Sequence, residues 1–130
     1  MNTFVTSDLH FGHKNIIQYC NRPFTSVEEM DEVLIQNWNK EVKPTDTVWI
    51  LGDFSFYKEE KTVEILNRLH GYHHMVMGNH DRGYGKSYEF YKRVMLSVDD
   101  YLRVTIDMHK FVLCHFPFAA WERGYVNLHG

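Results

Sequence analysis

Features that define several other protein classes are scarce in this sequence of 130 residues. Only two cysteines occur, Cys20 and Cys114, and their isolated contexts predict reduced structural thiols rather than a disulfide framework or a cysteine metal site. No stretch approaches the roughly 18 apolar residues of a membrane span, and the first residues lack the basic and apolar regions of a secretory signal. We therefore expect a cytoplasmic protein with no membrane partner.

An excess of positive charge is also missing. The sequence has 14 Lys and Arg against 17 Asp and Glu, a formal net charge of -3, so a broad surface for binding nucleic acid is not expected. Hydrophobic residues make up 44% of the chain and charged residues 24%, which is typical of globular proteins. The length predicts a single domain over residues 1–130. Histidine is the unusually frequent residue, with nine copies.

Short apolar runs alternate with amphipathic segments along most of the chain. The runs predict buried strands over 2–7, 47–51 and 73–77. Ser26 followed three residues later by Glu29 is a capping box, which predicts the start of a helix. Other helices are expected over 15–20, 59–69 and 86–93.

The pattern changes after these elements. Alternating or apolar runs over 101–107 and 110–114 predict a hairpin. The tight turn is expected near Met108 and His109. Strands and helices that alternate and then give way to a hairpin predict a mixed α/β fold, with helices on at least one face of a mixed sheet.

Polar residues follow directly after four of the predicted strands. These residues are Asp8 and His10; Asp53; Asn79, His80 and Asp81; and His115. The carboxyl ends of parallel strands meet at one edge of a sheet, so we expect these side chains to converge. Each segment alone is also compatible with a turn or a structural histidine, but turns do not require imidazole. Oxygen and imidazole ligands without thiolate suit divalent Mn, Fe, Zn or Ni, and ligands for more than one ion indicate a two-metal site.

The segments DLH, GD, GNHD and CHFP, in this order, resemble the signature of the calcineurin-like metallophosphoesterase superfamily: D-x-H, G-D, G-N-H-[DE], a later H and a final G-H-x-H. The longer run SDLHFGHKNIIQYCNRPF resembles the small phage and bacterial phosphoesterases of that superfamily. The resemblance implies a β-sandwich of mixed sheets flanked by helices. It also implies metal-dependent hydrolysis of phosphodiesters, with monoesters and nucleotides among the substrate classes to consider.

The resemblance further implies a role for each matching metal ligand. Asp8 and His10 would bind one divalent ion, and Asp53 would bridge two. Asn79 and His115 would bind the second ion. A hydroxide held between the ions would attack phosphorus, with Mn²⁺ as the expected activating ion and Fe, Zn or Ni as alternatives.

The same resemblance implies roles in proton transfer and substrate binding. His80 would act as the general acid, and Asp81 would orient its imidazole. Asn79 would stabilise the charge on the phosphoryl oxygens. Outside the signature, the positions of His13 beside Asp8 and of Arg82 directly after GNHD make them candidate substrate contacts, although polarity at a helix start would explain His13 equally well and a solvated helix face would explain Arg82.

The final G-H-x-H element departs from the signature. Gly130 aligns with its glycine, and the two histidines would follow it, whereas His129 stands one position before it. The sequence therefore predicts a domain that stops inside this motif, lacks the C-terminal strands and exposes a sheet edge that favours homo-oligomers. The alternative hypothesis is a catalytically impaired metal-binding scaffold or interaction module, but a scaffold has no need of the bridging Asp53 and the acid His80.

Overall fold

The computed structural model describes residues 1–130 and contains two β-sheets and four helices. The first sheet is parallel, in the order β1 (Thr3–Thr6), β2 (Thr47–Ile50), β3 (Tyr72–Val76) and β4 (Ser97–Asp99). The second is mixed and contains β5 (Tyr101–Ile106), β6 (His109–Cys114) and β7 (Val126–Leu128). The helices are α1 (Lys14–Tyr19), α2 (Val27–Glu41), α3 (Glu59–Arg68) and α4 (Tyr88–Val94).

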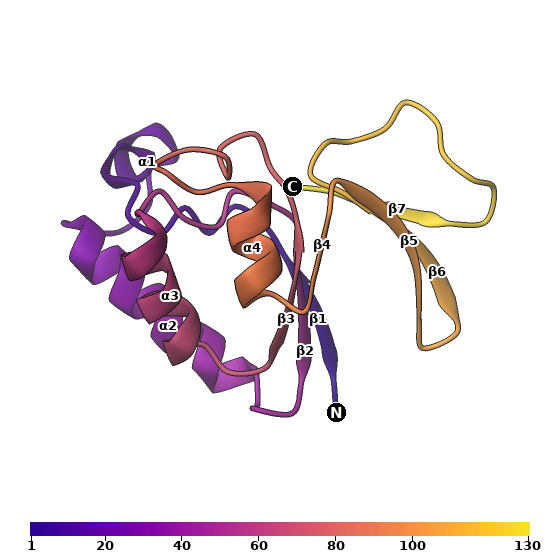
Figure 1. The fold of residues 1–130 in the computed structure, drawn as a ribbon, viewed down its shortest axis with the longest axis horizontal. Coiled ribbons are helices and arrows are strands. Elements are labelled where there is room, and N and C mark those ends of the chain that lie inside the picture. Colours follow the sequence, from indigo (N-terminus) through magenta and orange to yellow (C-terminus); the bar gives the residue numbers. More distant parts are fainter.

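Three layers result from this arrangement. Figure 1 shows the helices on one face of the parallel sheet and the second sheet on its other face. The alternation of side chains along β2 explains both contacts. Val48 and Ile50 belong to the core on the helix side, whereas Trp49 and Leu51 belong to the core between the sheets. The predicted mixed α/β fold, with mixed sheets flanked by helices, is confirmed.

Every helix and strand predicted before residue 95 is present, with ends within two residues of those expected. The predicted cap of α2 is present as well, since Ser26 Oγ accepts a hydrogen bond from the Glu29 amide at 3.1 Å. The strands β4 and β7 were not predicted. Each has only three residues, which is too short to display an alternating pattern, and its position depends on the neighbouring strand.

The hairpin between β5 and β6 turns one residue earlier than expected. Ile106 pairs with His109, and the two residues between them, Asp107 and Met108, have φ angles of 48° and 65°. Two successive left-handed residues form a type I′ turn, whose twist matches the twist of the strands. The position was hard to predict because neither residue is the glycine that normally marks such a turn.

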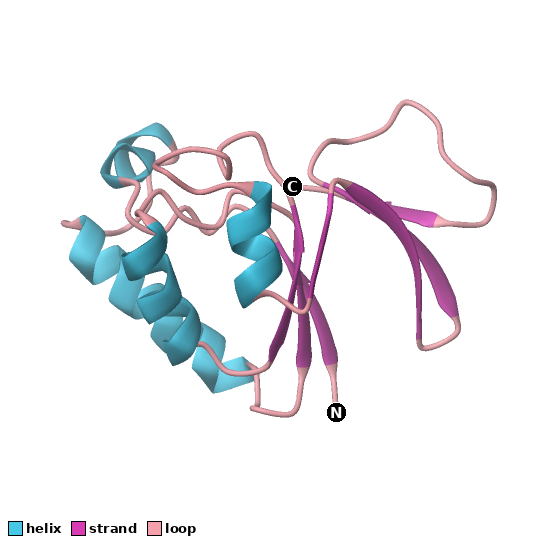
Figure 2. Cartoon of the chain, viewed as in Figure 1, coloured by secondary structure: helices cyan, strands magenta, loops and turns pink.

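The loops that matter for function gather at one edge. Figure 2 shows long loops leaving the carboxyl ends of the parallel strands, at the end of the sheet near the C-terminus of the chain. Both cysteines are free, as expected from their isolated contexts. None of the helices combines the length and the apolar character that crossing a bilayer requires.

Candidate metal centre

The loops after β1 and β2 run side by side beyond the ends of the strands. The Asp8 amide donates to the Gly52 carbonyl and the His10 amide donates to the Asp53 carbonyl, both at 3.0 Å. This pairing continues the parallel register of β1 and β2 into the loops. It therefore brings Asp8 and His10 next to Asp53, although 45 positions separate Asp8 from Asp53 in the sequence.

Three of these side chains stand on unusual backbone. Asp8, His10 and Asp53 have φ angles of 56°, 57° and 52°. Left-handed backbone costs a residue other than glycine about 1–3 kcal/mol, and such residues persist where the surrounding structure fixes them. Aspartate tolerates this region better than most residues, and histidine is also enriched in it. Three such positions in one site indicate that side-chain placement, rather than turn stability, determines this backbone.

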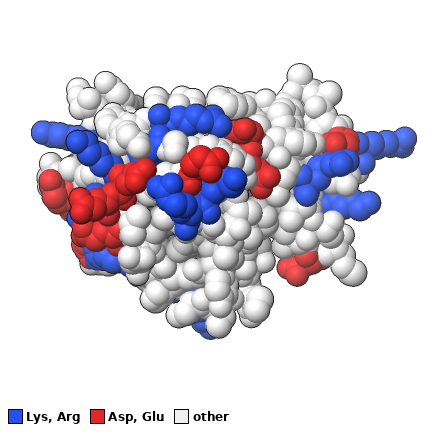
Figure 3. Space-filling model, viewed as in Figure 1, with Lys and Arg blue, Asp and Glu red and all other residues white.

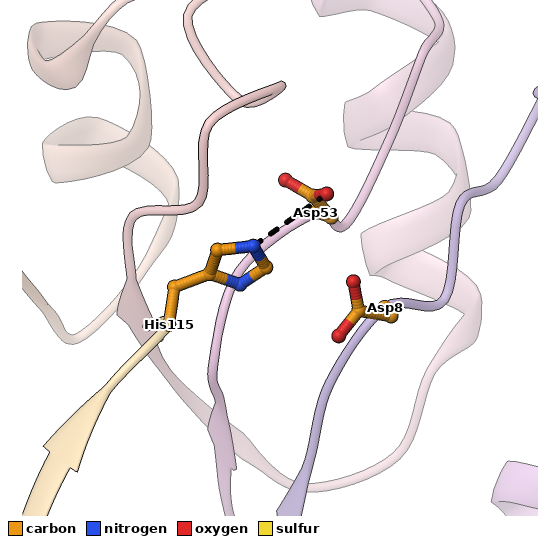
Figure 4. Close-up of side chains that lie close together, drawn as sticks. All are labelled: Asp8, Asp53 and His115. Carbon is orange, nitrogen blue, oxygen red and sulfur yellow. Dashed lines mark ion pairs between the residues drawn. The ribbon is translucent and has the colours of Figure 1, made fainter. Parts of the chain in front are cut away.

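The donor atoms are close enough to share a metal ion. Asp8, Asp53 and His115 each offer one atom, and these atoms lie within 4.8 Å of one another. Figure 4 shows the three side chains arriving from three different strand ends and facing a common space. His10 Nε2 lies 3.4 Å from Asp8 Oδ1 and 3.5 Å from Asp53 Oδ2. Asp53 Oδ2 is also 3.7 Å from His115 Nε2, so this carboxylate lies between the two imidazoles.

The orientation of His115 suits a metal ligand. Its Nδ1 lies 2.7 Å from the Leu51 carbonyl, to which it can donate a hydrogen bond. The opposite nitrogen, Nε2, faces Asp53 and lies 3.0 Å from Asn79 Oδ1. Metal-bound histidines are commonly fixed in this way by a carbonyl or carboxylate behind the ring. The carboxylate, amide oxygen and imidazole donors fit divalent Mn, Fe, Zn or Ni.

Burial also favours the neutral form of His10. Loss of solvent lowers the pKa of this imidazole, an effect that the Asp53 and Asp8 carboxylates partly oppose. Neutral imidazole is the form that binds a metal ion.

Two glycines allow the loops to approach one another. Gly52 has a φ angle of 92°, and a Cβ at this position would lie 2.6 Å from His115 Nδ1. A Cβ on Gly78 would lie 2.6 Å from the Asp53 amide nitrogen. Both distances are too short for real atoms, so the glycines of the GD and GNHD segments are required by packing at the site.

Asp81 is placed differently from the expectation. Its fully buried carboxylate accepts three backbone hydrogen bonds, from the amides of Gly78 (2.6 Å), Asp53 (2.8 Å) and Phe54 (2.9 Å). Burial raises the pKa of the carboxyl group, and the three amides act against that rise. No hydrogen bond joins Asp81 to the His80 ring, so the contact expected between them is not present. Asp81 instead joins the loop after β3 to the loop after β2.

His80 and His13 lie at the open side of the cluster. The His80 amide donates to Asp53 Oδ1 at 3.0 Å, while its ring is exposed and 6.1 Å from the His10 ring. His13 Nδ1 lies 3.0 Å from His10 Nδ1. The His13 ring also stacks on Phe56, with the ring centres 3.9 Å apart. Both imidazoles therefore lie beside the candidate metal ligand His10.

Arg82, a candidate substrate contact, and His129, which stands beside the incomplete final motif, are directed elsewhere in this structure. The exposed Arg82 pairs with Asp100 at 3.1 Å. His129 is exposed, and its Nδ1 contacts the carbonyl of Gly130. Gly130 itself lies beside the site, because its amide donates to the His115 carbonyl at 2.9 Å.

Sequence reasoning missed the contribution of Arg22. Its guanidinium group donates to the Asp8 carbonyl at 2.8 Å and to the Leu9 carbonyl at 2.9 Å. These two hydrogen bonds to backbone carbonyls stabilise the left-handed turn at Asp8. No local pattern marks this role, although Arg22 stands inside the longer segment that resembles small phosphoesterases.

Comparison with known proteins identifies the family of the chain. Residues 1–130 match the family described as calcineurin-like phosphoesterase. The uncharacterized protein MJ1445 of Methanocaldococcus jannaschii is 38% identical over 91% of this chain, and the gene 66 protein of Mycobacterium phage L5 is 32% identical over 92%. A crystal structure of the Aquifex aeolicus protein AQ665, described as of unknown function, superimposes with a TM-score of 0.72 at 31% identity, over 90% of this chain.

These relatives are longer than the chain. The present chain spans 60% of the length of the Methanocaldococcus protein, 65% of the phage protein and 62% of the Aquifex chain. The family match covers residues 1–130 and therefore includes all of the candidate ligands described above.

Proposed function

The chain belongs to the calcineurin-like phosphoesterase family, and from this membership and the geometry of the site we propose that it is a metal-dependent hydrolase of phosphodiesters. Phosphomonoesters are the second substrate class to test. The observation that carries the proposal is the cluster of Asp8, Asp53 and His115, whose donor atoms lie within 4.8 Å of one another. Carboxylates at such a separation repel one another, so their placement is best explained by positive charge between them.

We propose that the site holds two divalent ions, with Mn²⁺ as the first choice. Asp8 and His10 would serve one ion, and Asn79 and His115 would serve the other. Asp53 would serve both, which agrees with its position between the two imidazoles. When bound, such ions supply Lewis acidity at the phosphoryl oxygens and lower the pKa of water.

His80 is proposed as the general acid. Its exposed ring can approach a substrate, while its backbone amide is fixed to Asp53 Oδ1. It would hold a proton on the imidazole and donate it to the oxygen of the departing group. A general acid of this kind contributes about 10²- to 10⁴-fold in rate.

The remaining residues are proposed to position the substrate or the site. Asn79 and His13 flank the cluster and would contact the phosphoryl oxygens. Arg82 would contact substrate only after leaving Asp100, which is inexpensive because an exposed pair contributes about 0–1 kcal/mol. Asp81 would position His80 through the backbone of the loop rather than through the ring.

Metal reconstitution tests the proposal directly. We expect metal-stripped protein supplied with Mn²⁺ to hydrolyse bis(p-nitrophenyl) phosphate, followed by the release of nitrophenolate. His115→Ala removes a ligand at the carboxyl end of β6 and should abolish this rate. His109→Ala is the matched control, because it removes an exposed histidine at the other end of the same strand.

The outcomes separate the enzyme from the alternative module. A rate that appears with Mn²⁺, is lost in His115→Ala and is retained in His109→Ala supports the proposal. No rate with Mn²⁺, Fe²⁺, Zn²⁺ or Ni²⁺ overturns it. Metal binding without hydrolysis would then favour the scaffold or interaction module on the same fold.

A further inference from the structure

A cleft of about 750 Å³ is lined by none of the candidate metal ligands. It lies between the start of α3, the loop at Tyr84 and Gly85, and α4. Its volume falls in the range of small-molecule sites, about 300–1,000 Å³. The proposed hydrolytic chemistry does not use any of its lining residues, so the cleft requires a separate explanation.

The walls of the cleft are apolar and aromatic. Val63 from α3 and Phe90 and Val94 from α4 face it, together with the ring of Tyr84. Tyr84 is the more accessible of the two aromatic residues that line the cleft, at 55% exposed against 2% for Phe90. A large exposed ring at the mouth of an apolar cleft is suited to stacking against a flat group.

Charges of both signs surround the opening. Lys58 and Arg93 stand on its rim with Glu59 and Glu60, and Arg93 pairs with Glu59 at 3.5 Å. Figure 3 shows basic and acidic side chains interleaved over this face of the molecule. Because the charges balance, the rim does not favour a polyanion such as a polyphosphate tail. It offers both donors and acceptors to an uncharged group with polar edges.

A continuous row of rings joins the cleft to the metal centre. The Tyr84 ring centre lies 5.5 Å from that of Phe56, which lies 5.1 Å from His80 and 5.2 Å from His10. Since His10 is a proposed metal ligand, a single ring, that of Phe56, separates Tyr84 from the proposed metal ligands. That separation suits the two parts of one substrate molecule.

The loop that carries Tyr84 is anchored next to the ring. Its backbone is left-handed, with a φ angle of 58°. The buried Lys86 anchors the loop by donating to the Tyr57 carbonyl, and its ammonium group lies 5.4 Å from the centre of the Tyr84 ring. A side chain on an anchored loop loses less conformational freedom when a ligand stacks on it than one on a free loop.

We propose that this cleft binds the nucleoside arm of the phosphodiester substrate, with the base stacked on Tyr84. This inference rests on the proposed function, because it assigns a substrate class to the same site. A nucleobase has the flat face that Tyr84 can stack against and the uncharged polar edges that the mixed rim can bind. The proposal therefore makes Tyr84 a specificity-determining residue outside the metal centre.

The kinetic test compares two diesters with the same leaving group. Thymidine 5′-(p-nitrophenyl phosphate) carries a base, whereas methyl p-nitrophenyl phosphate does not. We expect Tyr84→Ala to lower kcat/KM about tenfold for the thymidine diester and by less than about twofold for the methyl diester, as loss of one base–aromatic stack predicts. Tyr84→Phe should retain the preference. Tyr72→Ala is the matched control, because Tyr72 is similarly exposed, at 50%, but begins β3 at the opposite edge of the sheet.

A binding measurement keeps this inference separate from hydrolysis. Thymidine alone is titrated into the metal-free chain, and backbone amide resonances are followed by NMR. Shifts at Tyr84, Gly85 and Phe90 that disappear in Tyr84→Ala support the cleft even if no diester is hydrolysed. An equal decrease of kcat/KM for both diesters in Tyr84→Ala, or no decrease for either, would overturn the proposed base-binding cleft. Absence of thymidine-induced shifts in the unaltered chain would also overturn it, whatever the hydrolytic activity.

Discussion

Replacing Asp81 by asparagine distinguishes two roles for this buried carboxylate. If Asp81 oriented the His80 ring, the amide would leave stability unchanged and would lower only kcat. The structure instead places its oxygens on the amides of Gly78, Asp53 and Phe54. The side-chain oxygen of an asparagine could still accept from the amides of Gly78 and Asp53. Its N–H₂ group would then face the Phe54 amide, which is also a donor.

The size of the effect follows from these three bonds. One hydrogen bond to a charged acceptor is lost, at about 1.5–3 kcal/mol, and a buried donor is left without a partner, at about 1–3 kcal/mol. Relief of the buried charge offsets part of this, because burial already raises the pKa of Asp81. We expect Asp81→Asn to lower the free energy of unfolding by about 3 kcal/mol, or Tm by about 10 °C for a chain of this length.

Urea unfolding and Mn²⁺ calorimetry measure the two consequences. Because the same carboxylate fixes the Asp53 amide, weaker Mn²⁺ binding should accompany the lower stability. Asp107→Asn is the matched control, since this exposed turn residue tolerates asparagine in left-handed backbone and should change stability by no more than about 0.5 kcal/mol. If Asp81→Asn kept its stability and metal affinity and only its kcat decreased, the proposal that Asp81 acts by binding the backbone amides of the loops would be refuted.

Two further predictions concern the support of the ligands and the dependence of stability on pH. Arg22→Lys should weaken Mn²⁺ binding about 10- to 100-fold, because a single ammonium group cannot bridge the Asp8 and Leu9 carbonyls as the guanidinium group does. Calorimetry measures the affinity, and an unchanged value would contradict this prediction. Burial lowers the pKa of His73 and His74 from 6.5, so the unfolded chain takes up more protons than the folded chain as pH falls through that value. The contribution of these two histidines to the free energy of unfolding should therefore be fully present above about pH 7 and should decrease toward pH 5. In the variant His73→Gln/His74→Gln, the urea midpoint should decrease less over the same pH range.

The sequence by itself determined most elements and the order of the candidate ligands. Apolar runs, the capping box at Ser26 and the polar residues after strand ends are local signals, because each depends on neighbours within a few positions. Parallel strands then bring Asp8 and Asp53 to one edge without further information. The ligand roles themselves came from the resemblance of four short segments to a family signature.

Only the tertiary structure decided how that edge is supported. Arg22 behind the turn at Asp8, the three amides on Asp81 and the ring row that ends at Tyr84 join residues from separate loops. The short strand β4 likewise exists because β3 offers it a partner. Such contacts depend on how distant segments fold against one another, and no periodicity or spacing within a single segment records them.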